Sequence, residues 1–184
     1  MPARTRYVVL LRGINVGGKN KLPMAKLRAF LEDLGFADVA TYIQSGNAVL
    51  TSTLAAKTVA RKIETGLGTA FKFDTALIKV LVLSAAEVKA VIAKRPKGFG
   101  DEPGKHHSDV VFLIDLPLEV ALTAFSPLDG VDTLWSGTAV IYHQRLSAQR
   151  TRSHLSRVVA SPHYKSMTIR NWNTTTKLAA LLAE

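Results

Sequence analysis

Residues 13–19 read GINVGGK and match the first seven positions of the phosphate-binding loop pattern G-x-x-x-x-G-K. In loops of that type, backbone amides and the lysine surround the phosphates, and the following serine or threonine binds magnesium. Asn20 stands here in place of that hydroxyl, and the helical pattern begins only near Met24, several residues beyond Lys19. The sequence therefore argues against a nucleotide-hydrolysing loop.

The same stretch still has the composition of an anion-binding loop. Glycines allow positive φ and close backbone approach, so successive amides can converge on a negatively charged group. Cationic and amide side chains add further donors. The residues that we assign here to a ligand-binding site are Arg12, Gly13, Asn15, Gly17, Gly18 and Lys19. Ordinary turn chemistry is the alternative, because glycine and asparagine are common turn residues and Arg12 can simply pair with an acid.

The elements expected to carry this loop follow one another in the order β-α-β-β-α-β. Short apolar runs rich in β-formers predict strands, and apolar residues at helical spacing predict helices. The predicted elements are a strand at 6–11, a helix at 24–34, strands at 39–44 and 47–52, a helix at 59–67 and a strand at 76–83. Ser45-Gly46 is a two-residue connection of the kind that closes an antiparallel hairpin.

This topology brings a second loop to the candidate site. In a split β-α-β unit the first two strands run in the same direction, so the loop after the first and the hairpin after the second lie at one end of the sheet. We therefore add the hairpin residues Gln44, Ser45, Gly46 and Asn47 to the ligand-binding site. The alternative is that Asn47 only bonds the loop backbone and holds the hairpin closed.

The second half of the chain repeats the pattern and adds a helix. Ser84 and Glu87 form a capping box for a helix that Pro96 ends, and the glycine- and proline-rich residues 96–107 predict a connection or a mobile loop. The next predicted elements are a strand at 109–114, a helix at 118–125, strands at 131–135 and 138–143 parted by Ser136-Gly137, a helix near 155–159, a strand at 166–170 and a helix at 178–182.

We predict an α+β fold of two tandem ferredoxin-like units with antiparallel sheets, plus a C-terminal helix. The predicted boundaries are residues 1–83 for the first unit, 84–106 for the connecting helix and loop, and 107–184 for the second unit. The apolar run of residues 8–11 predicts a first strand buried on both faces. A covered sheet argues against RNA binding through exposed sheet aromatics.

The C-terminal block MTIRNWNTTTKL, residues 167–178, is the second unusual stretch. One interpretation makes Arg170, Asn171, Trp172 and Asn173 part of the ligand site, with the tryptophan as a wall. The other makes Asn173 or Thr174 the cap of the last helix and Trp172 a packed staple before its first turn. A tryptophan can serve both roles, because it can pack one face and offer the other.

Charge is unevenly distributed along this chain of net charge +10. Residues 1–31 hold seven Lys or Arg and no acid, residues 32–132 hold ten bases and thirteen acids, and residues 133–183 hold seven bases and no acid. If the two ends meet in the fold, they form one positive surface; otherwise they are two solvated faces that point apart.

Composition narrows the chemistry. The absence of cysteine excludes thiol catalysis and disulfides and suits a cytoplasmic protein. The N-terminal residues lack a signal-peptide core, and no apolar run is long enough to span a membrane, so we expect no membrane partner. The five histidines show no metal-ligand spacing, and no G-x-S-x-G elbow is present. We expect no metal site.

Residues 10–50 and the block 167–178 closely resemble the bacterial domain-of-unknown-function family 1697. The resemblance spans nearly the whole chain and implies an α/β protein of ferredoxin-like topology with a duplicated unit. It implies no activity and no cofactor. Members of that family often carry a G-R-S-K-L-like segment, where this chain has TRSHL with Thr151 and His154 in place of the glycine and the lysine. Any chemical role of that lysine is therefore in doubt here.

The function that we expect is binding of an anionic small molecule, carrying phosphate or carboxylate, at the basic glycine-rich loop. One alternative is a nucleic-acid-associated module that contacts the nucleic-acid backbone with the same basic surface. Another is an enzyme acting on a phosphorylated metabolite, for which Arg12 and Lys19 are electrophilic donors but no base is evident. The sequence assigns no catalytic residue, no cofactor and no oligomeric state.

Overall fold

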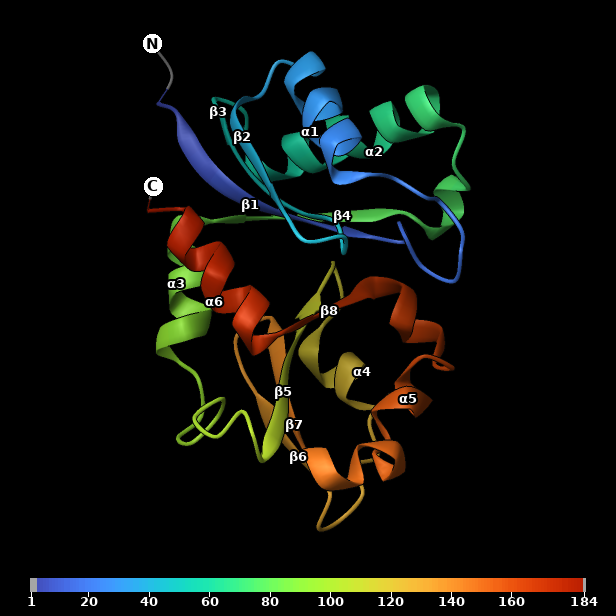
Figure 1. The fold of residues 1–184 in the computed structure, drawn as a ribbon, viewed down its shortest axis with the longest axis vertical. Helices are drawn as coiled ribbons and strands as arrows, with labels where there is room; N and C mark the ends of the chain where they lie inside the picture. The colour runs from blue at the N-terminus through green and yellow to red at the C-terminus, as the bar shows by residue number, and fades with distance from the viewer. Residues whose placement is uncertain (1–2, 184) are drawn as a thin grey trace. The chain divides into compact units, whose positions relative to one another are not determined.

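The computed structural model describes residues 3–183 and contains two four-stranded antiparallel sheets with helices (Figure 1). The elements are β1 (Thr5–Arg12), α1 (Met24–Asp33), β2 (Ala37–Tyr42), β3 (Asn47–Ser52), α2 (Ala56–Phe71), the 3-10 turn η1 (Thr75–Leu77), β4 (Lys79–Ser84), α3 (Ala85–Ala93), β5 (His106–Leu113), α4 (Leu118–Leu122), β6 (Asp132–Ser136), β7 (Val140–Leu146), the 3-10 segment η2 (Ser147–Arg152), α5 (Leu155–Val158), the 3-10 turn η3 (Pro162–Ser166), β8 (Met167–Asn171) and α6 (Trp172–Leu181).

The two sheets have the same topology. Their strand orders are β2-β3-β1-β4 and β6-β7-β5-β8, and every pairing is antiparallel. The predicted α+β fold of tandem ferredoxin-like units with a C-terminal helix is confirmed. The chain forms two compact units: the first runs up to Lys89 and includes the residues from Lys177 onward, and the second is Ala90–Thr176. The sequence-based boundaries after residues 83 and 106 stay predictions.

The core of the first unit lies between its sheet and the helices α1 and α2. Alternate residues of β1 point to one face, so Tyr7, Val9 and Leu11 share the core with the apolar stripes of the helices. In α2, Val59, Ile63 and Leu67 recur every four residues and are fully buried. Burying three such side chains stabilises the unit by roughly 5–9 kcal/mol before the entropic cost of folding.

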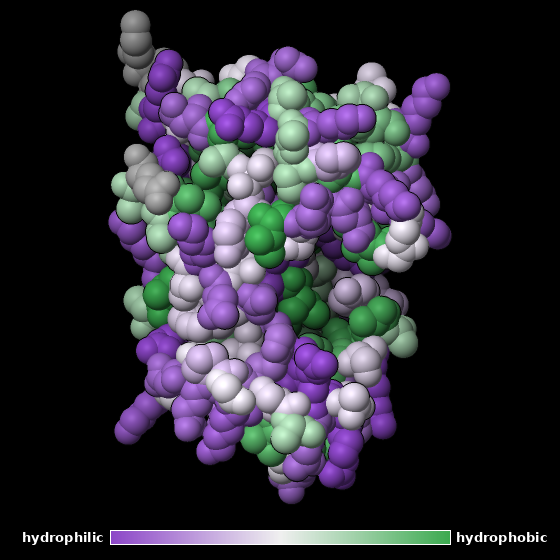
Figure 2. Space-filling model, in the orientation of Figure 1, coloured by the Kyte–Doolittle hydropathy of each residue, from purple (hydrophilic) through white to green (hydrophobic). Residues whose placement is uncertain are grey.

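The opposite face of β1 is buried as well. Val8 and Leu10 are each 1% exposed. The prediction that this strand is covered on both faces is therefore confirmed, and the sheet offers no exposed aromatic platform for single-stranded RNA. On the face of the molecule seen in Figure 2, most exposed residues are hydrophilic and hydrophobic ones occur in small groups. No helix among residues 3–183 is long and apolar enough to cross a membrane.

Both predicted hairpins are present, but neither turn is the one expected. Tyr42 pairs with Asn47, which leaves four residues in the first turn. In the second, Ser136 pairs with Ile141 and the Gly137 amide donates to the Val140 carbonyl at 2.9 Å, so the turn residues are Thr138 and Ala139 rather than Ser136 and Gly137. The Asn47 amide Nδ2 donates to the carbonyl of Tyr42 and to Ser45 Oγ, both at 3.1 Å. This side chain closes the first hairpin, so Ser45-Gly46 alone is not the turn.

The glycine-rich connection before β5 is anchored rather than mobile. Phe99 is fully buried and meets Trp135, Tyr142 and Trp172 edge to face, with ring centroids 5.2–6.1 Å apart. Gly100 has a φ of +78°, and a Cβ there would lie 2.3 Å from the Trp172 ring. The glycine is therefore needed both for the backbone conformation and for the close approach of the indole.

Gly100→Ala should destabilise the second unit by about 2–4 kcal/mol, because it combines a left-handed φ with overpacking against Trp172. Gly104→Ala, in the same connection but with open space around it, is the control and should cost much less. Both tryptophans of the chain lie in this unit, so urea unfolding followed by tryptophan fluorescence measures the effect. Equal unfolding midpoints for the two variants would contradict the anchored connection.

Candidate functional site

The stretch that resembles a phosphate-binding loop is a tight turn. Val16 and Lys19 form a bridge, and the Lys19 amide donates to the Val16 carbonyl at 2.9 Å. Gly17 and Gly18 between them have φ of +57° and +76°. Two consecutive positive φ angles are the mark of a type I′ turn, which explains the glycine pair. Helix α1 begins at Met24, so its N-terminus is not part of this turn.

Asn15 fastens this loop to the neighbouring hairpin. Its Oδ1 accepts from the Leu22 amide at 2.7 Å, and its Nδ2 donates to the carbonyls of Leu22 at 2.9 Å and Gln44 at 3.0 Å. The backbone of Asn15 has a left-handed conformation, with φ of +52°, that asparagine tolerates better than most residues. Asn15 is therefore an internal brace of the loop, with its amide group fully engaged.

Asn20 fastens the other side of the loop. Its Nδ2 donates to the Gly13 carbonyl at 2.9 Å, and its Oδ1 accepts from the Asp74 amide at 3.1 Å. Arg12 Nη1 donates to the Leu77 carbonyl at 3.0 Å. A Cβ on Gly13 would lie 2.0 Å from that same carbonyl oxygen, so only glycine fits there. These contacts fix the loop against the segment around η1.

The loop and the hairpin lie side by side, as the topology predicts. Besides the bond from Asn15 to Gln44, the Leu11 amide donates to the Gly46 carbonyl at 2.8 Å. Gly46 has a φ of +75°, and a Cβ there would lie 2.9 Å from the Ile14 side chain. Ile43 in the same turn has a φ of +48°, which is sterically costly for a β-branched residue.

Two lysines remain for a ligand at this end of the sheet. Lys19 and Lys21 are exposed, and neither forms an ion pair with another residue in the described part of the chain. Gln44 and Ser45 are exposed beside them, and a Cβ on Gly17 or Gly18 would meet nothing within 4 Å. The surface of the turn therefore presents glycine backbone flanked by cations.

The four predicted site residues of the C-terminal block belong to the second unit. Arg170 is 8% exposed and donates to Thr168 Oγ1 and the Ile169 carbonyl, and burial lowers its pKa to about 10. Trp172 is buried against Phe99, and Asn173 is exposed. The cap of α6 is Asn171, whose Oδ1 accepts from the Thr174 amide at 2.8 Å, rather than Asn173 or Thr174 as expected. Their place in a ligand site stays a prediction.

Sequence reasoning missed a buried polar cluster in the second unit, centred on Asp132. Its side chain is fully buried and accepts from Ser153 Oγ and from the amides of Leu128 and His154, both at 2.9 Å. His143 Nε2 lies 3.2 Å away. Burial alone would raise the pKa of Asp132, but the three donors and the charge of His143 outweigh it and lower the pKa.

His143 occupies the middle of this cluster, with its side chain 2% exposed. Burial lowers its pKa, although Asp132 and Asp109 act in the opposite direction. Asp109 lies directly across the β5–β7 ladder, and Arg145 Nη2 is 3.5 Å from Asp109 Oδ2. Within residues 3–183, His143 Nδ1, Asp109 Oδ2 and Arg145 Nε are buried and have no hydrogen-bond partner.

One sequence signal could have found this cluster. Asp109, His143 and Arg145 interrupt apolar strands at positions that face the same side as the core residues Val111 and Ile141. Residues 133–183 contain no acid, but Asp132, just before them on β6, reaches His143 from the adjacent strand. No group of three metal-ligating side chains occurs within residues 3–183.

The TRSHL segment, residues 151–155, is attached to this cluster. Ser153 and the His154 amide both donate to Asp132, and His154 Nδ1 lies 2.7 Å from the Ser126 carbonyl oxygen. At the position for which the family resemblance implied a lysine, the His154 side chain therefore contacts a backbone carbonyl. This contact is structural, and a lysine amino group can also donate to a carbonyl.

A separate open groove lies on the first unit, lined by Leu34 and by the α2 residues Thr58, Arg61, Lys62, Thr65 and Gly66. It contains no residue of the predicted site. Its floor is apolar, and Lys62 lies over the Phe36 ring at 5.6 Å from the centroid. Nothing in its chemistry selects a ligand.

The family model described as protein of unknown function (DUF1697) matches residues 4–161. The chain belongs to this family. A similar solved structure is that of the conserved bacterial protein SP0830 from Streptococcus pneumoniae, with 29% sequence identity, a TM-score of 0.80, and coverage of 98% of this chain and 99% of the other. A comparison with curated proteins found no match. The resemblance noted from residues 10–50 and 167–178 is thereby confirmed at the level of the family.

The lowered pKa of His143 predicts that this DUF1697 member loses stability in mild acid. The unfolded chain takes up a proton near the ordinary histidine pKa of 6.5, while the folded His143 does so only at lower pH. Unfolding is therefore favoured as the pH falls below about 6.5, and again below 3.8, where the unfolded chain binds a proton that the folded Asp132 binds only at lower pH. Urea unfolding followed by tryptophan fluorescence between pH 7.5 and about 5 measures the slope.

His143→Gln should flatten the dependence of the unfolding free energy on pH between about 7 and 5. His163→Gln, on η3, is the matched control and should keep the wild-type slope. A wild-type protein whose stability does not change across this range would refute the role given to His143.

Proposed function

We propose that this protein binds an anionic small molecule, carrying phosphate or carboxylate, at one end of the first sheet. The binding surface comprises the loop of residues 13–23 and the hairpin turn of residues 43–46. Arg12, Lys19 and Lys21 supply positive charge, and the glycine pair supplies backbone donors. A cytoplasmic location, suited to a chain without cysteine, is part of the same proposal.

The observation that carries the proposal is the length of this loop. The two units share one topology, yet residues 13–23 between β1 and α1 number eleven, whereas residues 114–117 between β5 and α4 number four. A four-residue connection is therefore sufficient to join strand to helix in this fold. The additional residues of the first unit are not needed for the topology, and long ordered loops are where binding residues concentrate.

The loop is rigid enough to act as a site. Asn15 and Asn20 form six hydrogen bonds to backbone groups on both sides of the loop, so little conformational entropy is lost on binding. Residues 1–31 contain no acid that could neutralise the lysines. The nearby Asp74 carboxylate already accepts from the Ala76 amide at 3.2 Å.

Binding, rather than turnover, fits these contacts. The polar side chains Asn15, Asn20 and Asn47 are engaged in holding the backbone, and no histidine lies in residues 1–73 to act as a base. Water and salt weaken the attraction between exposed lysines and anions. We therefore expect a modest affinity, with Kd on the order of a millimolar or somewhat tighter.

Titration calorimetry with pyrophosphate and citrate at low ionic strength should detect binding to the wild-type protein. Lys19→Ala/Lys21→Ala should weaken the affinity about tenfold or more, because both cations flank the turn. Lys26→Ala, an exposed lysine on α1 of the same unit, is the control and should bind nearly as the wild type does.

Thermal shift gives an independent readout, because a ligand that binds only the folded state raises the melting temperature. No stabilisation by any member of a millimolar panel of phosphates and carboxylates would overturn the proposed function. Equal affinity of the wild type and the double variant would remove the loop from it.

A further inference from the structure

A second basic surface lies on the second unit and shares no residue with the loop discussed above. The segment of residues 145–165, called here the basic segment, carries five Lys or Arg and no acid. It joins the third strand of the second sheet, β7, to the fourth, β8, through η2, α5 and η3. Four of its cations are exposed, namely Arg150, Arg152, Arg157 and Lys165.

We propose that the basic segment binds the sugar-phosphate backbone of nucleic acid without reading its sequence. The inference is independent of the small-anion site on the first unit, because it uses different residues of the other compact unit. Charge complementarity is its first support. The side chains of Arg150, Arg157 and Lys165 form no hydrogen bond or ion pair with another described residue, and that of Arg152 donates only to Gln149 Oε1.

The first unit shows that this fold can join its third and fourth strands without a segment of this kind. In the first unit the third and fourth strands are joined by α2, a 16-residue helix that buries Val59, Ile63 and Leu67. In the second unit that long helix is replaced by 3-10 turns and the four-residue helix α5, which buries only Leu155 and Val158. Most of the basic segment therefore faces solvent rather than the core.

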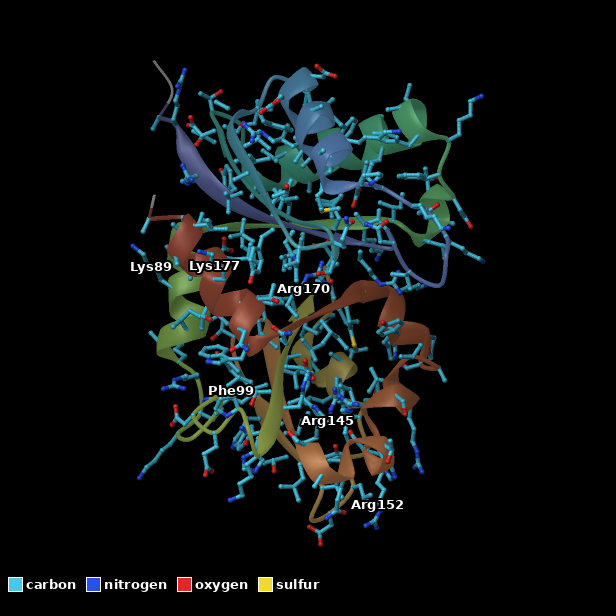
Figure 3. The ribbon with its side chains drawn as sticks, viewed as in Figure 1. Lys89, Phe99, Arg145, Arg152, Arg170 and Lys177 are labelled. Atoms are coloured by element: carbon cyan, nitrogen blue, oxygen red, sulfur yellow. The ribbon has the colours of Figure 1, made fainter. Side chains whose placement is uncertain are left out.

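The buried Asp132 holds the middle of the basic segment in place. Ser153 and His154 lie between Arg152 and Arg157 in the sequence. Ser153 Oγ and the His154 amide donate to the Asp132 carboxylate, and His154 Nδ1 contacts the Ser126 carbonyl. Asp132 is fully buried, so it cannot pair with the exposed arginines. Figure 3 shows Arg152 at the outer surface of the unit and Arg145 inside it. Fixed cations lose less conformational freedom on binding than mobile ones do.

The chemistry of these cations favours phosphates in a polymer. Three of the four are arginines, whose planar guanidinium groups bind phosphate oxygens in pairs. A membrane surface is a poorer match, because α5 has four residues and Val159 is the one large hydrophobic side chain of the segment that is strongly exposed. No helix in the segment is long enough to read bases in a major groove, so contacts to phosphates dominate.

The test is fluorescence anisotropy of the full chain with labelled single-stranded RNA, single-stranded DNA and duplex DNA of about 20 nucleotides, from about 50 to 200 mM salt. The proposal expects binding at low salt, with little dependence on sequence, and a logarithm of affinity that falls linearly with the logarithm of salt. Arg150→Gln/Arg152→Gln/Arg157→Gln should weaken binding about tenfold or more and reduce the salt slope by roughly two to three.

The matched control removes the same charge from exposed positions of the first unit, as Lys26→Gln/Arg61→Gln/Lys89→Gln. This variant should bind nearly as the wild type does, and so should Lys19→Ala/Lys21→Ala, which separates the inference from the proposed function. If the triple arginine variant is unstable by circular dichroism, Arg150→Gln/Arg157→Gln repeats the test without the contact of Arg152 to Gln149.

Absence of binding to all three probes at low salt would overturn the inference. Equal weakening by the control variant would also overturn it, because the effect would then come from net charge rather than from the basic segment. Sedimentation with phosphatidylserine vesicles, in the absence of nucleic-acid binding, would assign the surface to membranes instead.

Discussion

The set of hydrogen bonds made by Asn15 determines what the long loop of the first unit can do. One side-chain amide bonds to both backbone groups of Leu22 and to the carbonyl of Gln44, so it closes the loop and joins it to the hairpin. Because the side-chain amides of Asn15 and Asn20 are engaged internally, an incoming ligand meets glycine backbone and lysines rather than free asparagine side chains. The loop is thus a rigid cationic turn, which favours recognition of charge over recognition of shape.

The fold was predictable because local signals agreed with the tertiary structure. The β-α-β-β-α-β order follows from apolar periodicity in the strands and in α1 and α2, and the Ser84–Glu87 capping box is present, with the Ser84 amide and Oγ both 2.7 Å from Glu87 Oε2. Turn lengths were less predictable. The hairpin between β2 and β3 depends on Asn47 bonding across the turn and on a left-handed Ile43, and no local propensity indicates either feature.

The buried cluster of the second unit shows where reading a sequence along the chain fails. Asp132, His143 and Asp109 lie on three different strands and meet only because β6, β7 and β5 are neighbours in the sheet. The excess of basic residues in the C-terminal region was visible in the sequence, but some of these residues are buried and others are exposed. Arg170 lies in the interior and Arg145 is largely buried, whereas the arginines of η2 and α5 face solvent. Only the exposed ones are available to a charged partner.

The backbone amides of Gly17 and Gly18 report most directly on anion binding at the first unit. In ¹⁵N-labelled protein titrated with pyrophosphate, the account predicts that both resonances shift progressively to saturation. The amide of Gly35, an exposed glycine of the same unit with a φ of +84°, should remain nearly unchanged. Unchanged Gly17 and Gly18 resonances at saturating anion, or equal shifts of all three glycines, would contradict the claim that this loop is the binding site.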